Sequence, residues 1–463
     1  MDVDAVTRNE SLHVDRGRLL LEDCDLVAIA ERFGTPLFAV SESQLRRNYR
    51  RIRDAFADCW SEGEVHILPA FKAAPYIAIR KILSEEGAGC DTFGPSELEG
   101  AVLGDTPAEL ISVNGSLKSR ETIRRGIELG ARIVIDAPRE LEICHEEGAR
   151  LDKAARVLLR IKPRLKLELE SDFAPVSIDE LTQRLRYGLP TNEALPLGPK
   201  ADRSEYINVI GFHCHIGRHS TQMPVWETLV HAAVALVAQL RESWGWRDWQ
   251  PQILDFGGGY APPGNYDTDH HRSGEPAPSI ESYAKAMTEA LRESLSHHGM
   301  SGEGLAIELE PGRALHSDTG VHLTRVGNIK ESTGATRRKW AEVDTSEQFL
   351  GTYAMDPSVP PFKFIVANKA DREANEIVDI VGKSCGGEML LLDSRVPLLE
   401  AGDLIALLDT GAYIESLSCN FNAMPRPGTL LISDDQAEWI REPESIEQVF
   451  SRDRVPVWTR NNR

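Results

Sequence analysis

Several features of secreted and membrane-spanning proteins are missing from this sequence. The N-terminus, Met1–Asp4, is acidic and lacks the basic and apolar regions of a signal peptide. No run approaches the roughly 20 consecutive apolar residues that cross a bilayer, and the most apolar windows, such as Leu229–Leu240, are short and interrupted by polar residues. We therefore expect a cytoplasmic protein that does not interact with membranes.

Cysteine and positive charge are both scarce. The seven cysteines are scattered and include no CxxC pair, which favours reduced thiols over a disulfide framework or a zinc site. The 52 Lys and Arg residues are outnumbered by 72 Asp and Glu residues, and the net charge of -20 disfavours binding to nucleic acid. GxGxxG and GxxxxGK[ST] motifs are also absent, so the usual signals of dinucleotide and Walker-type sites are missing. A small-molecule ligand is the better expectation.

What the sequence does contain, between Val65 and Pro311, is a repeated alternation of apolar runs and amphipathic helical stretches. Runs rich in Val, Ile and Leu that alternate with helices indicate parallel strands buried on both faces. Eight such units match the size and pattern of a (β/α)8 barrel, and an open doubly wound sheet is the alternative. The expected strands are His66–Phe71, Ala88–Thr92, Leu110–Asn114, Arg132–Asp136, Val157–Lys162, Val209–His215, Ile253–Phe256 and Leu305–Leu309.

After about residue 320 the pattern changes to β-rich segments with few helical stretches. We therefore expect an α/β protein in which a barrel over residues 36–320 precedes a mostly β domain over residues 321–463, with residues 1–35 joining the β domain. The expected strands of that domain are His322–Val326, Ile377–Val381, Leu404–Leu408 and Thr429–Ser433.

Chemically useful side chains follow several of the expected barrel strands. Lys72 ends the first strand, where a lysine points into the barrel mouth and a desolvated amine can form a Schiff base. Gly257–Gly259 follow the seventh strand and let backbone amides approach a phosphate. Glu310 and Arg313 follow the eighth strand, beside which barrels commonly bind phosphate. Each has a structural alternative: Lys72 can be a surface lysine, the glycines can form a flexible turn, and Glu310 and Arg313 can form a surface ion pair.

Histidines occur at two places where a metal ion has to be considered. His213 and His215 share one face of the sixth strand, but neighbouring side chains on a strand diverge, so zinc is less favoured than hydrogen-bonded core histidines. A flat imidazole there can also stack on an aromatic cofactor. The second place is the loop Ala261–Pro278, which contains Asp267, Asp269, His270 and His271. Adjacent histidines in a loop rarely converge on one metal ion, so a solvated loop is the favoured interpretation. We expect no metal site.

Together these motifs resemble the fold-type III, pyridoxal-phosphate-dependent decarboxylases, most closely the diaminopimelate decarboxylase branch, over nearly the whole chain. The resemblance implies a pyridoxal-phosphate-binding (β/α)8 TIM barrel, a C-terminal β domain, and decarboxylation of an amino acid by a homodimer. The motifs that carry it are Ala70–Ala73, Cys90–Leu98, His213–Gly217, Leu254–Gly259, Glu310–Arg313, Gly382–Cys385 and Asp409–Tyr413.

The resemblance also implies roles for single residues. Lys72 would bind pyridoxal 5'-phosphate covalently, and His215 would stack on the pyridine ring. Glu310 would pair with the pyridinium nitrogen and keep the ring protonated as an electron sink. Cys385 would come from the neighbouring subunit and take part in protonating the product, so that the active site is shared across a dimer. The other residues expected around the cofactor are Asp91, Gly257, Gly258, Gly259, Gly312, Arg313 and Tyr413.

The sequence departs from the family pattern where the distal end of the substrate is recognised. Gly386–Met389 follow Cys385 in place of the family's Glu-Ser-Gly-Asp, and Val343–Tyr353 contain no arginine where the family has Arg-Pro-x-x-Tyr. Because a lost bidentate partner for a carboxylate is not replaced by a generic lysine, we expect an altered substrate specificity. The candidate substrate-binding residues are Arg218, Lys363 and Glu388.

Three other functions remain as alternatives: diaminopimelate decarboxylation itself, amino-acid racemisation on the same barrel, and a non-catalytic paralogue that binds pyridoxal phosphate. Racemases of this fold need a tyrosine base opposite the lysine, whereas Cys385 stands at the resembling place. The presence of Lys72, Glu310 and Cys385 together disfavours the non-catalytic alternative.

Overall fold

The computed structural model describes residues 7–169, 176–217, 221–262, 277–333, 338–351 and 362–456. The chain divides into two compact units. Leu45–Ser317 form one, here called the barrel unit, and Met1–Gln44 with Asp318–Arg463 form the other, here called the β unit.

The eight strands predicted for the barrel are all present and form one parallel sheet in the order β5-β14-β13-β12-β9-β8-β7-β6. The two end strands approach each other, since the Gly89 N–H donates to the Ile67 carbonyl at 2.9 Å and Ala70 and Asp91 form a parallel bridge. The sheet is therefore a nearly closed barrel, which confirms the first alternative and excludes an open doubly wound sheet. The strands are β5 (Val65–Ile67), β6 (Cys90–Thr92), β7 (Ile111–Val113), β8 (Arg132–Ile135), β9 (Ala155–Arg160), β12 (Ile207–His213), β13 (Ile253–Asp255) and β14 (Ala306–Leu309).

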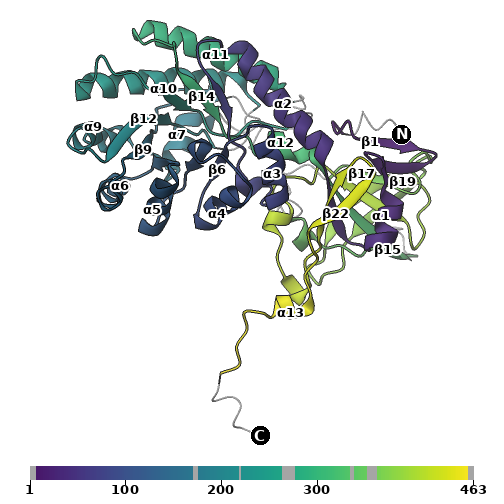
Figure 1. Ribbon diagram of the computed structural model, residues 1–463. Helices are drawn as coiled ribbons and strands as arrows, with labels where there is room; N and C mark the ends of the chain where they lie inside the picture. The colour runs from purple at the N-terminus through teal and green to yellow at the C-terminus, as the bar shows by residue number, and fades with distance from the viewer. Residues whose placement is uncertain are drawn as a thin grey trace. The chain divides into compact units, whose positions relative to one another are not determined.

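Helices cover the outside of this barrel, which is why its strands are buried on both faces (Figure 1). Their ends follow local signals; for example, the Ser119 side chain accepts from the Thr122 N–H at the start of α5, and Gly130 ends that helix with φ 88°. The helices are α2 (Glu42–Cys59), α3 (Ile77–Glu85), α4 (Pro95–Leu103), α5 (Arg120–Leu129), α6 (Pro138–Leu151), α7 (Ile178–Arg184), α8 (Thr191–Ala194), α9 (Leu197–Ala201), α10 (Met223–Trp244), α11 (Ile280–His297) and α12 (Arg313–His316). A small hairpin pairs β10 (Glu168–Leu169) with β11 (Val176–Ser177).

The first barrel strand is shorter than predicted. β5 ends at Ile67, and Phe71–Ala73 form a 3-10 turn that contains Lys72. Pro69 has no N–H to donate to a strand ladder. The backbone nevertheless continues along the neighbouring chain, because Leu68 and Ala70 donate to the carbonyls of Leu309 and Pro311. Lys72 therefore still lies beyond the carboxyl end of β5.

Helix α10 has the length and apolar composition of a membrane span, although the sequence led us to expect no such segment. Half of its most apolar window is buried, and the helix packs against α11. Trp226 and Trp244 at its two ends are both buried. This burial is the pattern of a core helix in a barrel.

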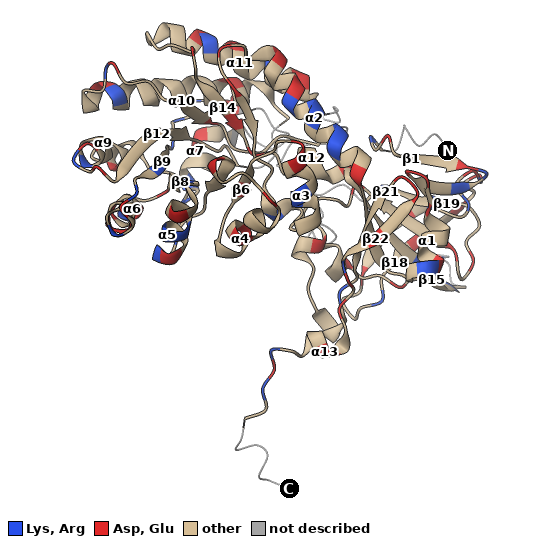
Figure 2. Ribbon diagram, in the orientation of Figure 1, with Lys and Arg blue, Asp and Glu red and all other residues tan. Residues whose placement is uncertain are grey.

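Both signs of charge are interspersed on the outer helices α2 and α5 (Figure 2). On α5, Arg120 binds Glu147 and Arg125 lies 2.7 Å from Glu99. Glu147 is buried, so only the Arg125–Glu99 pair is an exposed one, and such a pair contributes little to stability.

The β unit contains all four strands predicted after residue 320. Its nine-stranded sheet has the order β19-β18-β16-β15-β4-β21-β22, and β20 pairs with both β15 and β17. β4 (Leu37–Ser41) comes from the N-terminal part of the chain and lies between β15 and β21. The other strands are β15 (Gly320–Glu331), β16 (Lys339–Val343), β17 (Phe364–Val366), β18 (Glu376–Val381), β19 (Met389–Val396), β20 (Leu404–Leu408), β21 (Thr429–Ser433) and β22 (Gln436–Arg441).

The N-terminal residues of the β unit form a separate three-stranded sheet and one helix. These are β1 (Leu12–Asp15), β2 (Arg18–Leu21), β3 (Cys24–Asp25) and α1 (Leu26–Phe33). Leu19, Leu21 and Leu26 share a core with Leu323, Ala406 and Leu430 of the large sheet. A short helix, α13 (Ile446–Val449), follows the last strand and begins with a capping box formed by Ser445 and Gln448.

His322 on β15 makes the stability of the β unit depend on pH. It is fully buried, bonds Thr345 Oγ1 through Nε2 at 2.7 Å, and packs on Phe38. Burial lowers its pKa to about 3, so below pH 6.5 the unfolded chain binds a proton that the folded chain does not. We expect urea unfolding to show that acidification from pH 6 to pH 5 costs the wild type about 1 kcal/mol more than it costs His322→Gln. His13→Gln, at an exposed position of β1, is the control, and equal losses in all three proteins would contradict the assignment.

Candidate active site at the barrel mouth

Side chains from four strand ends form a hydrogen-bonded chain at the mouth of the barrel unit. The Lys72 amine donates to Asp91 Oδ2 at 2.7 Å. The Asn114 amide donates to Asp91 Oδ1 at 2.8 Å and to Glu310 Oε1 at 2.5 Å. Asp91, Asn114 and Glu310 are buried, whereas the Lys72 side chain is 42% exposed. The chain therefore connects an accessible amine to a buried carboxylate.

Asn114 was not among the residues singled out from the sequence. Asn114 contacts both Asp91 and Glu310, because its amide nitrogen carries two hydrogens and donates one to each acid. Its sequence signal is the same as that of Lys72 and Glu310: a polar residue directly after an apolar barrel strand.

Two buried acids and a histidine meet next to this chain. Ligand atoms of His213, Asp255 and Glu310 lie within 4.8 Å of one another, and His213 Nε2 is 3.4 Å from Glu310 Oε2. Burial raises the pKa of both carboxyl groups, and the charge of Glu310 raises that of Asp255 further. The positive charge of Lys72 opposes the shift at Glu310. Because the pKa of both carboxyl groups is raised and the two charges would repel each other, the pair is arranged to hold one proton between them.

His213 is buried and hydrogen-bonded to Glu310. It is therefore a core histidine, which the sequence favoured over a zinc ligand. Burial, followed by the nearby Arg160 cation, lowers its pKa well below the usual value, so the ring is neutral. His213, Asp255 and Glu310 are residue types that bind metal ions. In this structure, however, the Glu310 carboxylate is already bound by Asn114 and His213.

His215 lies beyond the end of β12, at the mouth. Its Nδ1 accepts the Gly217 N–H at 2.8 Å, which places the proton of the neutral ring on Nε2. Burial, and then Arg160, lowers its pKa well below the usual value. The ring packs against Gly257, where a Cβ atom would lie 2.7 Å from ring carbon Cδ2, and φ is +66°. Glycine is therefore required beneath this flat, uncharged ring.

The glycine loop and Arg313 follow neighbouring strands. Gly257–Gly259 follow β13, and Gly312 and Arg313 follow β14 at the start of α12. A Cβ atom on Gly258 would lie 2.4 Å from the Glu310 carbonyl oxygen, so the two loops approach closely. The structure thus brings Lys72, Asp91, His215, the glycines, Glu310 and Arg313 to one end of the barrel unit.

Cys385 is exposed on the β unit and is held by a residue that the sequence did not reveal, Asn422. The Asn422 amide donates to Cys385 Sγ at 3.2 Å, and its carbonyl accepts the Cys385 N–H at 3.1 Å. Asn422 has φ +57°, a left-handed conformation that asparagine tolerates better than most residues. Two bonds to one side chain fix both the backbone and the thiol of Cys385.

The other candidates on the β unit have internal contacts. Glu388 is buried and accepts from Ser346 Oγ at 2.5 Å. The Lys363 amine lies 3.6 Å from Asp409 Oδ2. Tyr413 is partly exposed and has φ +58°. Arg218 and the candidate metal ligands of the loop, Asp267, Asp269, His270 and His271, lie outside the described residues.

Comparisons with known proteins agree with this geometry. Residues 42–317 match the family model of the pyridoxal-dependent decarboxylase, pyridoxal binding domain. The diaminopimelate decarboxylase of Methanocaldococcus jannaschii is 29% identical over 97% of this chain and 98% of its own length, and that of Bacillus subtilis is 30% identical over 94% and 95%. The crystal structure of the M. jannaschii enzyme superposes with a TM-score of 0.84 at 28% identity, covering 97% of this chain and 99% of that one. The resemblance seen in the sequence is confirmed.

Proposed function

Because this chain belongs to the pyridoxal-dependent decarboxylase family, we propose that it decarboxylates an amino acid other than diaminopimelate, with Lys72 as the residue that binds the cofactor. The coarser function, pyridoxal-phosphate-dependent decarboxylation of an amino acid, follows from the family. The observation that carries the residue assignment is the chain of hydrogen bonds from Lys72 through Asp91 and Asn114 to Glu310.

The side chains at the barrel mouth fit pyridoxal phosphate. The cofactor needs an accessible amine, a carboxylate for its ring nitrogen, a flat neighbour for its ring and backbone amides for its phosphate. Lys72, Glu310, His215 and the loop Gly257–Gly259 have these properties, and Gly259 adopts φ +109°, which favours glycine. Arg313 and Gly312 follow the adjacent strand and would contribute to the same phosphate site, with Tyr413 as a further candidate.

The mechanism assigns a separate task to each side chain. When bound, pyridoxal phosphate supplies the electron sink that accepts the electron pair left when carbon dioxide departs. Asp91 holds the Lys72 amine at the mouth, and Glu310 would keep a proton at the ring nitrogen of the bound cofactor. Asn114 and His213 hold Glu310 in place. The neutral ring of His215 would cover one face of the bound cofactor ring.

Cys385 is proposed as the group that delivers a proton to the product. Its thiol is exposed on the β unit, as a group that acts on a site in a second subunit must be. Asn422 fixes the direction of the Sγ atom. By the resemblance, the complete site would combine Lys72 of one subunit with Cys385 of the other in a homodimer.

Diaminopimelate is expected to be a poor substrate. The arginine that the family uses for the distal end is missing from Val343–Tyr353, and Gly386 stands directly after Cys385 where the family has a glutamate. Leaving a charged group desolvated without its partner costs on the order of 2 to 5 kcal/mol, or roughly thirty-fold to several-thousand-fold in kcat/KM. Carbon dioxide release should be measured for the diaminopimelate stereoisomers, lysine, ornithine, arginine, glutamate and 2-aminoadipate.

The second candidate is diaminopimelate decarboxylation itself, which is favoured by the names of the relatives that match over nearly their whole length. If a diaminopimelate stereoisomer gives the highest kcat/KM of the panel, the proposed change of specificity is wrong and the second candidate holds. Loss of optical activity without release of carbon dioxide would instead indicate a racemase.

A further inference from the structure

A cavity of about 440 Å³ opens in the barrel unit beside the carboxyl ends of β7, β8 and β9. Ser116 in its wall comes two residues after Asn114, the member of the hydrogen-bonded chain described above that follows β7. Leu117 and Ile143 give it an apolar part, and both signs of charge also line it. Its polar lining includes Ser116, Asp136, Lys162, Arg186 and Glu193.

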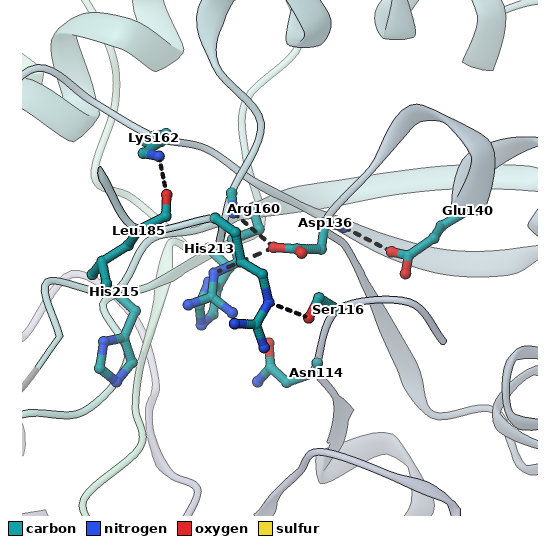
Figure 3. A network of polar contacts seen from close by, with 12 residues as sticks. Asn114, Ser116, Asp136, Glu140, Arg160, Lys162, Leu185, His213 and His215 are labelled. Atoms are coloured by element: carbon teal, nitrogen blue, oxygen red, sulfur yellow. Dashed lines mark hydrogen bonds and ion pairs between the residues drawn. The ribbon is translucent and has the colours of Figure 1, made fainter. Parts of the chain in front are cut away.

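The backbone on both sides of Arg186 is anchored to strand ends of the barrel. Figure 3 shows the contact between Lys162 and Leu185, the residue before Arg186. The Lys162 amine donates to the Gln183 carbonyl at 3.0 Å and also to that of Leu185. On the other side, the Gly188 N–H donates to Asp136 Oδ1 at 2.7 Å. These anchors hold Arg186 at a fixed place in the cavity wall.

Contacts with Ser116 and Tyr187 also orient the guanidinium group of Arg186. Its Nε donates to Ser116 Oγ at 3.4 Å, and its Cζ lies 4.4 Å from the centroid of the Tyr187 ring. Within the part of the chain that the structure describes, Arg186 has no carboxylate partner. Its terminal N–H groups form a planar fork that fits a carboxylate in a bidentate way.

The other charges around the cavity are mostly paired with one another. Lys118 is buried 2.8 Å from Glu140, and Arg139 lies 2.9 Å from Glu142. Asp136 accepts the Gly188 N–H and lies 3.8 Å from Arg160 Nε.

Three charges at the cavity are left after this pairing. Lys162 is bonded to carbonyl oxygens, Arg186 has its fork free, and Glu193 is exposed at the rim. The balance of two cations against one acid favours an anionic group in the cavity.

We propose that this cavity receives the distal end of the amino-acid substrate and that Arg186 binds a carboxylate carried there. The inference rests on the proposed decarboxylase function and names the class of substrate: an aliphatic amino acid that ends in a second carboxylate and, unlike diaminopimelate, carries no second amine. Lys162 is a positioning residue, because it holds the backbone next to Arg186. The barrel unit thereby supplies a cation for the distal group, a task for which Lys363 and Glu388 are poorly suited because both are engaged within the β unit.

The test compares two probes of similar length and opposite distal charge, 2-aminoadipate and lysine, on the holoenzyme. Binding is read from the change in cofactor absorbance and turnover from carbon dioxide release. The wild type should prefer 2-aminoadipate. Arg186→Glu should lower kcat/KM for 2-aminoadipate roughly a hundred-fold, mainly through KM, and improve binding of lysine. Arg186→Gln should lose affinity for 2-aminoadipate without gaining any for lysine.

Arg184→Glu is the matched control, since Arg184 is exposed on the same segment but does not line the cavity. It should leave the ratio of the two probes within about two-fold of the wild type. If both Arg186 variants keep the wild-type ratio while amino acids are still decarboxylated, the cavity assignment is overturned and the decarboxylase function stands. If the wild-type holoenzyme releases carbon dioxide from no amino acid of the panel, both are overturned. Arg186 is exposed, so the variants should fold, and thermal unfolding verifies this.

Discussion

Mixing two inactive variants, Lys72→Ala and Cys385→Ala, should restore about a quarter of the wild-type activity. Each variant alone is expected to lose at least about a thousand-fold in kcat, because one lacks the amine that binds the cofactor and the other the thiol that returns a proton. If the active site combines Lys72 of one subunit with Cys385 of the other, random exchange makes half of the dimers mixed. Each mixed dimer has one intact site of two.

Subunit exchange has to be demonstrated independently, for example with differently tagged variants that co-purify after mixing. A mixture of Lys72→Ala with a second barrel-unit variant, Glu310→Gln, is the matched control, because both changes affect the same unit. In that mixture a mixed dimer has no intact site, so activity should stay low. Full exchange without recovery in the Lys72 and Cys385 mixture would mean that the two residues serve one subunit's site.

Replacing Glu310 by glutamine should lower kcat by about a thousand-fold and change KM by only a few-fold. The substitution keeps the shape of the side chain and a partner for Asn114. It removes the negative charge that holds a proton at the ring nitrogen of the cofactor. Without that proton the ring accepts the electron pair from the departing carboxyl group poorly, so the loss falls on the chemical step.

Glu303→Gln, the same substitution at an exposed position before β14, should leave kcat unchanged. The cofactor content of Glu310→Gln should be measured by absorbance, so that loss of cofactor is separated from loss of rate. A fully loaded Glu310→Gln protein that keeps more than about a tenth of the wild-type kcat would show that the ring nitrogen has another partner.

The barrel was predictable because its signal is local. Short runs of Val, Ile and Leu are buried on both faces wherever helices cover the sheet, and β8 (Arg132–Ile135) is buried at every position. Lys72 and Glu310 were also predictable, since polar residues at the carboxyl ends of barrel strands meet at one mouth whatever the details of the loops.

The residues that were missed depend on distant pairings. Asn114 gains its role only when β7 brings it beside two distant acids. Asp91 lies 23 positions before it in the chain, and Glu310 lies 196 positions after it. Asn422 contacts Cys385 across 37 positions through a left-handed backbone turn. Likewise β4 pairs with β15 and β21, which lie hundreds of residues later, and the sequence shows only five apolar and small residues there. Such long-range contacts leave no periodic pattern in one sequence.

The most direct test of the central claim is to locate the cofactor on the chain. The protein is purified with pyridoxal phosphate, reduced with borohydride and digested, and the peptide that carries the pyridoxyl group is identified by mass spectrometry. We expect the modification on Lys72 alone, with loss of amino-acid decarboxylation on reduction and no labelled peptide from Lys72→Ala. A pyridoxyl group on another lysine, or equal labelling of the Lys72→Ala protein, would contradict the account.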